Sequence, residues 1–533
     1  MKRRSRVSQI MRRVIATVAI ATGTAIVVGV LGVSSAGAAT FTVTNTADSG
    51  PGSLRRAIAD AGGTAGSDAV QFAPGVAGKI TLTSGQITIT SPVDVQGPGA
   101  DLVTVSGNDQ SRVFTVQSGK TASISGLTVA DGSAGTGGGI RNDGTLTLTN
   151  VTVRNNGAGG SSPDGRGGGI FNTGSLTLQR SFVDDNAVSG DDAAGGGIEN
   201  DGGSVALLQS TVRDNEAVGT GEPGDGTGGG IANDNGNLTI RSSTLSGNQA
   251  SGNLLVGVGQ GGAVFNGGRN LVITNSTISG NSTLGDGAGA AGIEDSSSGV
   301  TTLSADTIAS NTAGALDDGR GVNLTLSGAQ TTITNTIVAD ARGGPNCVRG
   351  TALTTRYDLE DANTCGFNAA SDQRNKEPRL APLEDNGGPT RTRSIPISSP
   401  ATDQGISAGL DNDQRGKDRP SVFPDIPKPP GGDGSDIGAY EIQAILATVT
   451  NNNDSGSGSL RQALGLGAIQ VRFAPSVTGT IALTSGPLRI NTDTEIVGPA
   501  AGSLTVSGSD QSRVFEVATG TTTTIRGLTV SKG

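Results

Sequence analysis

The stretch TGGGIRNDGTLTLTNVTVRNN, residues 136–156, decides the fold, because close copies of it recur along the chain. Each copy begins with Gly-Gly and an aliphatic marker and continues into a strand-like run such as LTLT. It closes with an aliphatic residue three positions before an Asn. Repetition with a period of about 30 residues indicates that each copy is one structural unit of a repeat protein. The markers are Ile140, Ile170, Ile198, Ile231 and Val264, with Ile293 and Val322 in decayed copies.

Each unit contains three short runs in which aliphatic residues alternate with polar ones, and Gly, Asn or Asp separates the runs. This alternation is typical of strands with one buried face, and no unit has the period of a helix. The spacing from the marker to the closing Asn is nearly constant, whereas the connection to the next marker varies in length. Three strands and one tolerant turn per unit predict an all-β parallel β-helix.

Stacked units would place equivalent residues in columns about 4.8 Å apart. We therefore expect two columns of Asn. An amide side chain has donors and an acceptor, so each Asn can bond to its copies above and below. A binding role for these columns is the weaker alternative. The first column comprises Asn142, Asn172, Asn200, Asn233 and Asn266, and the second comprises Asn156, Asn186, Asn215, Asn248, Asn281 and Asn311.

The start of the solenoid carries a helical pattern. Leu54 and Ala57 lie at helical spacing after Ser53, which is suited to an N-cap. A short amphipathic helix would cover strand edges that an open solenoid end exposes. We therefore expect a β-helix over residues 40–342 with an N-terminal cap at 53–60.

Residues 1–39 resemble a secretory signal peptide. Six basic residues precede an apolar run at 14–33, and Ala-Gly-Ala at 36–38 suits cleavage. An uncleaved membrane anchor is the alternative, because the run is about long enough to span a bilayer. The net charge of −10 becomes more negative without this segment, which disfavours nucleic acid and anionic membranes as partners. We expect a secreted or cell-surface protein with no integral membrane segment after signal cleavage.

The character of the chain changes near residue 343, where the marker vanishes and Pro becomes frequent. We expect residues 343–445 to close the C-terminal end of the solenoid. Cys347 and Cys365 are the two cysteines, and in an exported protein they are expected to form a disulfide. Two thiols without any His do not complete a zinc site, so we expect no metal or cofactor. Gly-Asp runs leave calcium as a weak alternative, although they lack the nonapeptide order of calcium-binding repeats.

The chain then begins again. TVTNTADSGPGSLRRAI at 42–58 returns as TVTNNNDSGSGSLRQAL at 448–464, and DQSRVF at 109–114 returns at 510–515. We therefore expect residues 446–533 to start a second, truncated β-helix. The second copy stops where the first enters its Gly-marked units, so we expect a fragment or a truncated product of a longer gene.

Four motifs occur in order after the repeats: DNGGPT (385–390), SPATDQG (399–405), DQRGKDRP (413–420) and DIGAYE (436–441). Together they resemble the choice-of-anchor Q proteins, a bacterial surface family with pectin-lyase-like right-handed β-helices. SLRRAI and SLRQAL resemble the opening motif of such proteins, although Gly stands where Cys is common. The GGGI units are also similar to repeats of polymorphic outer-membrane adhesins. The resemblance implies an exported right-handed parallel β-helix and no defined reaction.

Two functions compete for such a fold. We favour an adhesion or glycan-contact scaffold without catalysis, which binds extracellular glycans or a host or cell-wall surface. The alternative is a polysaccharide lyase or a glycoside hydrolase. A lyase needs carboxylates that hold Ca²⁺ and a basic residue, and Asp184, Asp214 and Arg213 are the candidate set. Outward positions of a solenoid need charges in any case, so we expect these residues to be structural.

Overall fold

The computed structural model describes residues 38–533 except 64–65, 160–164, 223, 254–256, 317–319, 329, 350–351 and 424–425. The expected signal peptide at 1–39 therefore lies outside the described residues, apart from its last two positions. None of the described helices is long and apolar enough to cross a membrane.

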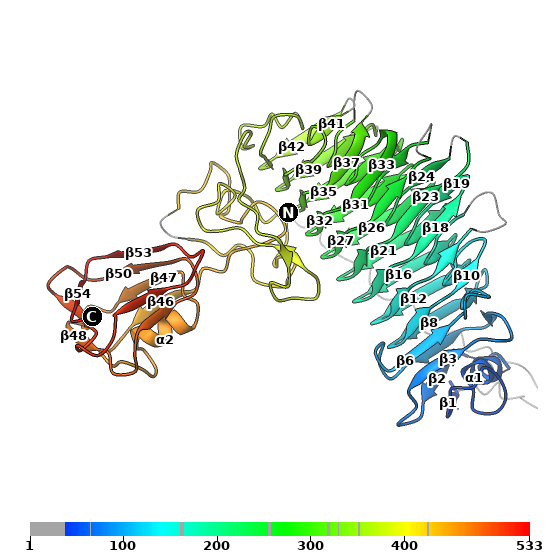
Figure 1. Ribbon diagram of the computed structural model, residues 1–533, viewed down its shortest axis with the longest axis horizontal. Coiled ribbons are helices and arrows are strands. Elements are labelled where there is room, and N and C mark those ends of the chain that lie inside the picture. The colour runs from blue at the N-terminus through cyan, green and yellow to red at the C-terminus, as the bar shows by residue number, and fades with distance from the viewer. Residues whose placement is uncertain are drawn as a thin grey trace, which may run out of the picture. The chain divides into compact units, whose positions relative to one another are not determined.

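Parallel strands stack along the first part of the chain into three long sheets (Figure 1). Within the described residues, sheet A runs from β1 (Thr40–Val43) to β42 (Leu353–Arg356) and has twelve strands. Sheet B has eleven strands, from β3 (Gly78–Thr81) to β43 (Leu359–Glu360). Sheet C has ten, from β4 (Ile87–Ile89) to β41 (Cys347–Arg349). One strand of each sheet per unit makes one coil, so the expected parallel β-helix is confirmed.

The register follows the repeats, because the aliphatic markers pair with one another. Ile140 lies opposite Ile170, which in turn lies opposite Ile198, and all three are fully buried. In β12 (Thr145–Thr149), Leu146 and Leu148 point inward between partly or fully exposed Thr residues. Burial of each such aliphatic side chain contributes about 1.5–3 kcal/mol. The core is therefore a set of stacked aliphatic columns.

Both Asn columns form hydrogen-bonded ladders at buried corners. In the first, Asn142 Nδ2 donates to Asn172 Oδ1 at 2.7 Å, and the ladder ends when Asn266 donates to Asp295. In the second, successive Nδ2–Oδ1 distances from Asn156 to Asn311 are 2.9 Å. This ladder continues through Asn323 and Asn346, at 2.8 and 2.9 Å. These two residues were not predicted, because they do not keep the spacing that closes each repeated unit.

The tolerant turns are more ordered than their variable lengths suggest. They pair with one another in sheet D, from β10 (Ser133–Ala134) to β37 (Thr312–Leu316). A smaller sheet E joins β19 (Asp192–Ala194), β24 (Asp225–Thr227) and β29 (Gly259–Gln260). The turns also bury a small apolar cluster, formed by Ala158, Val188, Ala193 and Ala217.

Helix α1 (Leu54–Ala61) is the expected N-terminal cap. The side chain of Ser53 accepts a hydrogen bond from Arg56 N at 3.2 Å, and the helix buries Leu54, Ala57, Ile58 and Ala61. Arg55 pairs with Asp48 at 2.6 Å, which fixes the helix to the preceding turn. Backbone donors and this guanidinium lower the pKa of Asp48 to about 2, against the opposing effect of burial.

The segment that follows the last coil packs in an unexpected place. It contains the antiparallel pair β44 (Leu383–Glu384) and β45 (Thr392–Arg393), and it lies along the outer side of sheet B. Thr244 Oγ1 donates to Arg391 O at 2.6 Å, and Thr277 Oγ1 donates to Gln414 Oε1 at 2.6 Å. The sequence predicted an end cap here, whereas this segment also covers the side of earlier coils.

Charged residues of the last two motifs, DQRGKDRP and DIGAYE, form a buried network. Arg419 and Glu441 are fully buried and pair at 2.9 Å, and Arg415 pairs with Asp413 at 2.7 Å. Glu441 also accepts from the backbone N–H groups of Ser421 and Asp436. Buried charges persist only when they are paired and hydrogen-bonded. These motif residues therefore hold the segment together internally.

Residues 446–533 form a second β-helix with its own cap. Helix α2 (Leu460–Gly465) repeats α1, with Ser459 as N-cap and an Arg461–Asp454 pair at 2.5 Å. Strands from β46 (Leu446–Val449) to β54 (Thr529–Ser531) stack in parallel around an apolar core of their own. The expected second solenoid is confirmed.

Candidate functional site

Two adjoining hollows lie on the outer side of sheet B. The strands that carry them have three residues each, and the middle residue points into the core. The first and third residues therefore point outward, where they form two columns. These strands are β13 (Thr152–Arg154), β17 (Phe182–Asp184), β22 (Thr211–Arg213) and β27 (Thr244–Ser246).

The first hollow has a volume of about 510 Å³ and is lined by the turns at 97–101 and 125–126 with Asn150, Thr152, Arg180 and Phe182. The second has a volume of about 280 Å³ and lies between strands β17, β22 and β27 and the loop 385–391. Phe182 lines both, so the hollows adjoin each other at its ring, and we call the two together the sheet B groove. It crosses six successive coils, which spans about 24 Å at a strand spacing of about 4.8 Å.

Phe182 is the exposed apolar feature of this groove. Its side chain is 39% exposed, whereas most large apolar side chains of the solenoid are fully buried. The neighbouring strands carry Thr152 and Thr211 at the same outward position. Phe182 was not predicted as a site residue, although an aromatic residue in a column of Thr was the available signal.

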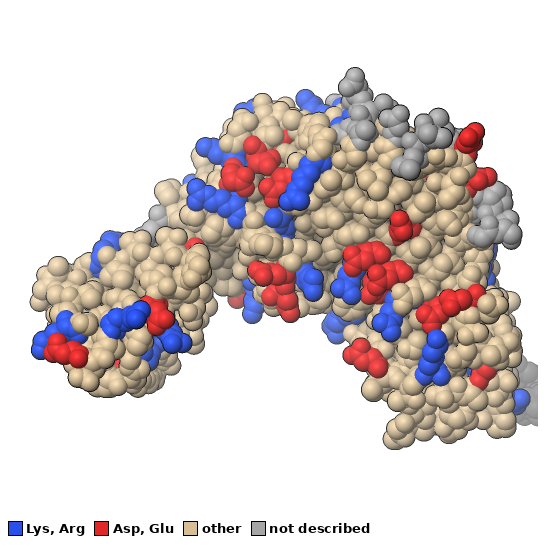
Figure 2. Space-filling model, in the orientation of Figure 1, with Lys and Arg blue, Asp and Glu red and all other residues tan. Residues whose placement is uncertain are grey.

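The three charged residues predicted for a lyase lie next to one another, although only Arg213 lines the groove. Arg213 Nη2 lies 3.1 Å from Asp184 Oδ2, and Arg213 Nε lies 3.9 Å from Asp214 Oδ2. Partial burial raises the pKa of Asp214, and the carboxylates of Asp185 and Asp184 add to this against the opposing charge of Arg213. Arg213 is thus held between two carboxylates. More widely, acidic and basic side chains alternate on the face in Figure 2 and form no patch of one sign.

The loop 385–391 forms the second wall of the smaller hollow. Thr390 Oγ1 donates to Ser242 O at 3.2 Å, and Gln414 Nε2 donates to Thr390 Oγ1 and Thr244 Oγ1 at 2.9 Å each. The side chain of Arg391 is exposed, and its positive charge acts against the raised pKa of Asp214. Sequence analysis could not place this loop, because nothing local links it to strands about 150 positions earlier.

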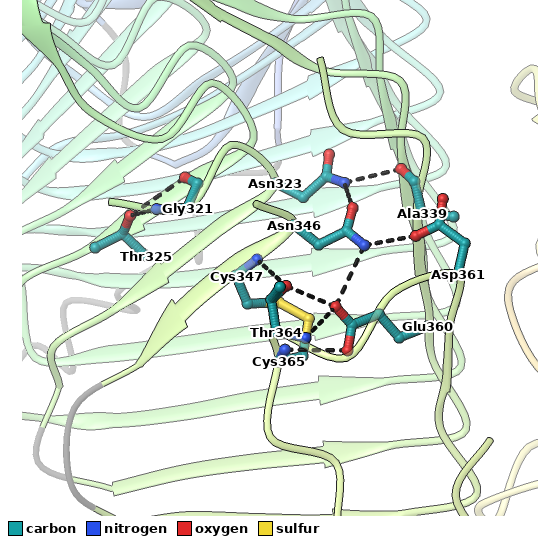
Figure 3. Close-up of a disulfide and its surroundings, with 10 residues drawn as sticks. All are labelled: Gly321, Asn323, Thr325, Ala339, Asn346, Cys347, Glu360, Asp361, Thr364 and Cys365. Carbon is teal, nitrogen blue, oxygen red and sulfur yellow. Dashed lines mark hydrogen bonds between the residues drawn. A yellow bond between two sulfur atoms is a disulfide. The ribbon is translucent and has the colours of Figure 1, made fainter. Parts of the chain in front are cut away.

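The disulfide joins Cys347 to Cys365, with an acidic side chain buried beside it (Figure 3). Glu360 accepts hydrogen bonds from Thr364 N at 2.8 Å and Cys365 N at 3.0 Å. Asn346, the last member of the second ladder, donates to Glu360 and to Asp361. The disulfide therefore joins the end of the second Asn ladder to the turn that follows it.

Acidic side chains at two places could be considered metal ligands by their chemistry. Carboxylates of Asp340, Asp361 and Glu377 lie close together, but Asp340 pairs with Arg393 at 3.2 Å and Asp361 accepts from Asp340 N. Asp225, in a Gly-Asp run, lies in β24 and accepts from Val258 N at 2.9 Å. Protein donors already occupy both groups, so we assign no metal site to them.

The protein is therefore a parallel β-helix that carries a groove along the outer side of one of its sheets. No protein-family model matches the chain, and no curated protein matches it. Among solved structures, the pectate lyase Pel9A aligns with a TM-score of 0.39 at 15% identity, covering 76% of this chain and 96% of its own. The alginate lyase AlyGC of family PL6 aligns with a TM-score of 0.33 at 14% identity, covering 92% of this chain and 71% of its own. At these values, neither enzyme's residues transfer to this chain.

Proposed function

We propose that the sheet B groove binds glycans and that the protein is an adhesion or glycan-contact scaffold without catalysis. The observation that carries the proposal is Phe182, an exposed ring between two hollows in a chain with ten Phe and no Trp. Sugar rings have apolar C–H faces that pack on an aromatic ring, and their hydroxyls bond to nearby polar groups. Arg180, Thr211 and Arg391 supply such groups along the groove.

The pairing and burial of the charged side chains near the groove favour glycan binding over catalysis. A general base must be able to reach a proton of the substrate, and a lyase site needs carboxylates converging on one cleft. Asp184 is only 6% exposed and is paired with Arg213, and that guanidinium also faces Asp214. A polysaccharide lyase remains the second candidate function, because Asp214 is exposed and its pKa is raised.

Surface location is part of the same proposal. A disulfide is stable in an oxidising compartment, and the leader-like residues 1–39 would direct export. We further propose that the chain is a choice-of-anchor Q protein with a β-helix at 40–342, a motif-bearing segment at 343–445 and a second β-helix from 446. The buried contacts around Arg419 and Glu441 support this, since they join three of the four motifs: Arg419 pairs with Glu441, and Asp403 N donates to Asp436.

The test is a binding panel with the full chain. Polygalacturonate, alginate, xylan and cellohexaose are titrated by calorimetry, and the same mixtures are assayed for unsaturated or shortened products. We expect at least one glycan to bind, with no product released. Phe182→Ala should weaken that binding about tenfold or more, which corresponds to about 1.4 kcal/mol. Leu284→Ala is the matched control, because Leu284 is 42% exposed and lies outside the groove.

Each outcome bears on a different part of the proposal. Absence of binding to all four glycans, or equal binding by the Phe182→Ala and Leu284→Ala variants, would refute glycan contact in this groove. Release of product that Asp214→Ala abolishes would establish the lyase alternative in its place.

A further inference from the structure

The sheet B groove is closed at one end by the chain itself. Beyond Thr211, the next outward Thr residues of sheet B are Thr244, Thr277 and Thr307, and each is no more than 1% exposed. All three bond to the C-terminal segment: Thr244 to Arg391 O, Thr277 to Gln414 and Thr307 to Ala439 N. The face that is open at Phe182 is therefore covered from the coil of Thr244 onward.

The wall at this end is firmly attached. Gln414 is 1% exposed, and its amide bonds at once to the strand residue Thr244 and the loop residue Thr390. Arg393, just after the loop, donates to Ser310 Oγ at 2.6 Å and pairs with Asp340 at 3.2 Å. With its contacts on both sides satisfied, the loop 385–391 is a fixed barrier.

The other end of the groove has a different construction. All residues that line the larger hollow belong to the coils of the solenoid itself, from the turn at 97–101 to Phe182. None of them comes from the C-terminal segment, so no second wall faces them there. A long ligand that lies along the coils can therefore extend past this end, while its other end meets the loop 385–391.

We infer that the groove recognises the terminus of a glycan chain and excludes the interior of a long chain. The inference rests on the proposed function. The terminal sugar would occupy the 280 Å³ hollow beside Phe182, against Pro389 and Arg391. The exposed guanidinium of Arg391 donates to the hydroxyls of that last sugar. A sugar chain with no end to present cannot reach this hollow.

The experiment compares each panel polymer with shorter chains of the same polymer at equal mass. Polygalacturonate, alginate and xylan are fragmented, and the amount of full-length protein bound at saturation is measured by calorimetry. Recognition of chain ends predicts that the number of sites per gram rises in proportion to the number of ends. A number of sites per gram that does not change on fragmentation overturns the inference, while Phe182-dependent binding would still stand.

A pair of variants tests the wall directly. Arg391→Ala should weaken binding of the shortened chains about tenfold, since a charge-assisted hydrogen bond is lost. Arg241→Ala is the control, because Arg241 is an exposed guanidinium in β26 (Asn237–Arg241) of sheet A, outside the groove. Equal binding by the two variants overturns the role of the wall. The reducing and non-reducing ends are distinguished by repeating the titration with chains whose reducing end has been chemically reduced.

Discussion

Replacement of Asn215 by Ala is expected to destabilise the solenoid far more than its small change in volume suggests. Asn215 is 1% exposed, and its Nδ2 donates to Val183 O, Arg213 O and Asn248 Oδ1 at 2.8–2.9 Å. Its Oδ1 accepts from both the backbone N and the Nδ2 of Asn186, at 3.1 and 2.9 Å. The side chain of Asn215 thus forms hydrogen bonds to the preceding coil, to its own coil and to the following coil.

The magnitude follows from which partners are left without a bond. Asn186 Nδ2 keeps Val153 O and Asp184 O as acceptors, but the buried backbone N–H of Asn186 loses Asn215 Oδ1. A buried donor without a partner costs about 1–3 kcal/mol, and the two carbonyls that lose a donor add to this. We therefore expect Asn215→Ala to lower the free energy of unfolding by about 4 kcal/mol, a large value for one residue.

Equilibrium urea unfolding, followed by circular dichroism, measures this free energy. Asn237→Ala provides the matched control, because Asn237 is exposed and its only side-chain bond among the described residues is to the exposed Asn270. The control should change the free energy of unfolding by less than about 0.5 kcal/mol. A value for Asn215→Ala as small as that of the control would refute the idea that the ladder stabilises the coils.

Two further predictions concern the end of the first solenoid and the segment that follows it. Burial raises the pKa of Asp403 from 3.8 to about 6, so the folded state favours the protonated carboxyl. The resulting stabilisation is fully present below pH 3.8 and is lost as the pH rises through about 6. The stability of Asp403→Asn should therefore fall less than that of the wild type between pH 4 and about 7, and parallel curves would contradict this. Replacement of both Cys347 and Cys365 by Ala should cost about 3 kcal/mol, because the disulfide closes a span of 18 residues. Reduction of the wild type should have the same effect on its thermal midpoint, and a midpoint insensitive to reductant would contradict the prediction.

The repeated part of the fold could be predicted because every unit has the same pattern of aliphatic and polar residues. Ile140 and Ile170 are equivalent in sequence and are partners in sheet C, so register follows from alignment of the units alone. The ladder could be predicted only as far as the closing spacing is kept, which is why Asn323 and Asn346 were missed.

The site could be predicted only in part. Asp184, Arg213 and Asp214 lie next to one another because they belong to neighbouring repeated units, whereas the part they play in a lyase site stays a prediction. The loop 385–391 was not placed beside them, because its bonds to Ser242 and Thr244 cross 147 or 148 positions without a repeating pattern. The four motifs were visible, but their order along the chain does not reveal that Arg419 and Glu441 are buried together.

The similar sequence separation of paired residues in successive coils also determines how such a chain can grow as it folds. Ile140 pairs with a residue 30 positions later, and Ile198 pairs with a residue 33 positions later. Closing a loop of about 30 residues costs about 3 kcal/mol of chain entropy, and this cost is the same for the second coil as for the last. With α1 blocking the first edge, each finished coil is the template for the one that follows it. The protein can therefore fold in the order in which it is synthesised, and lengthening it by one coil adds no greater entropic barrier.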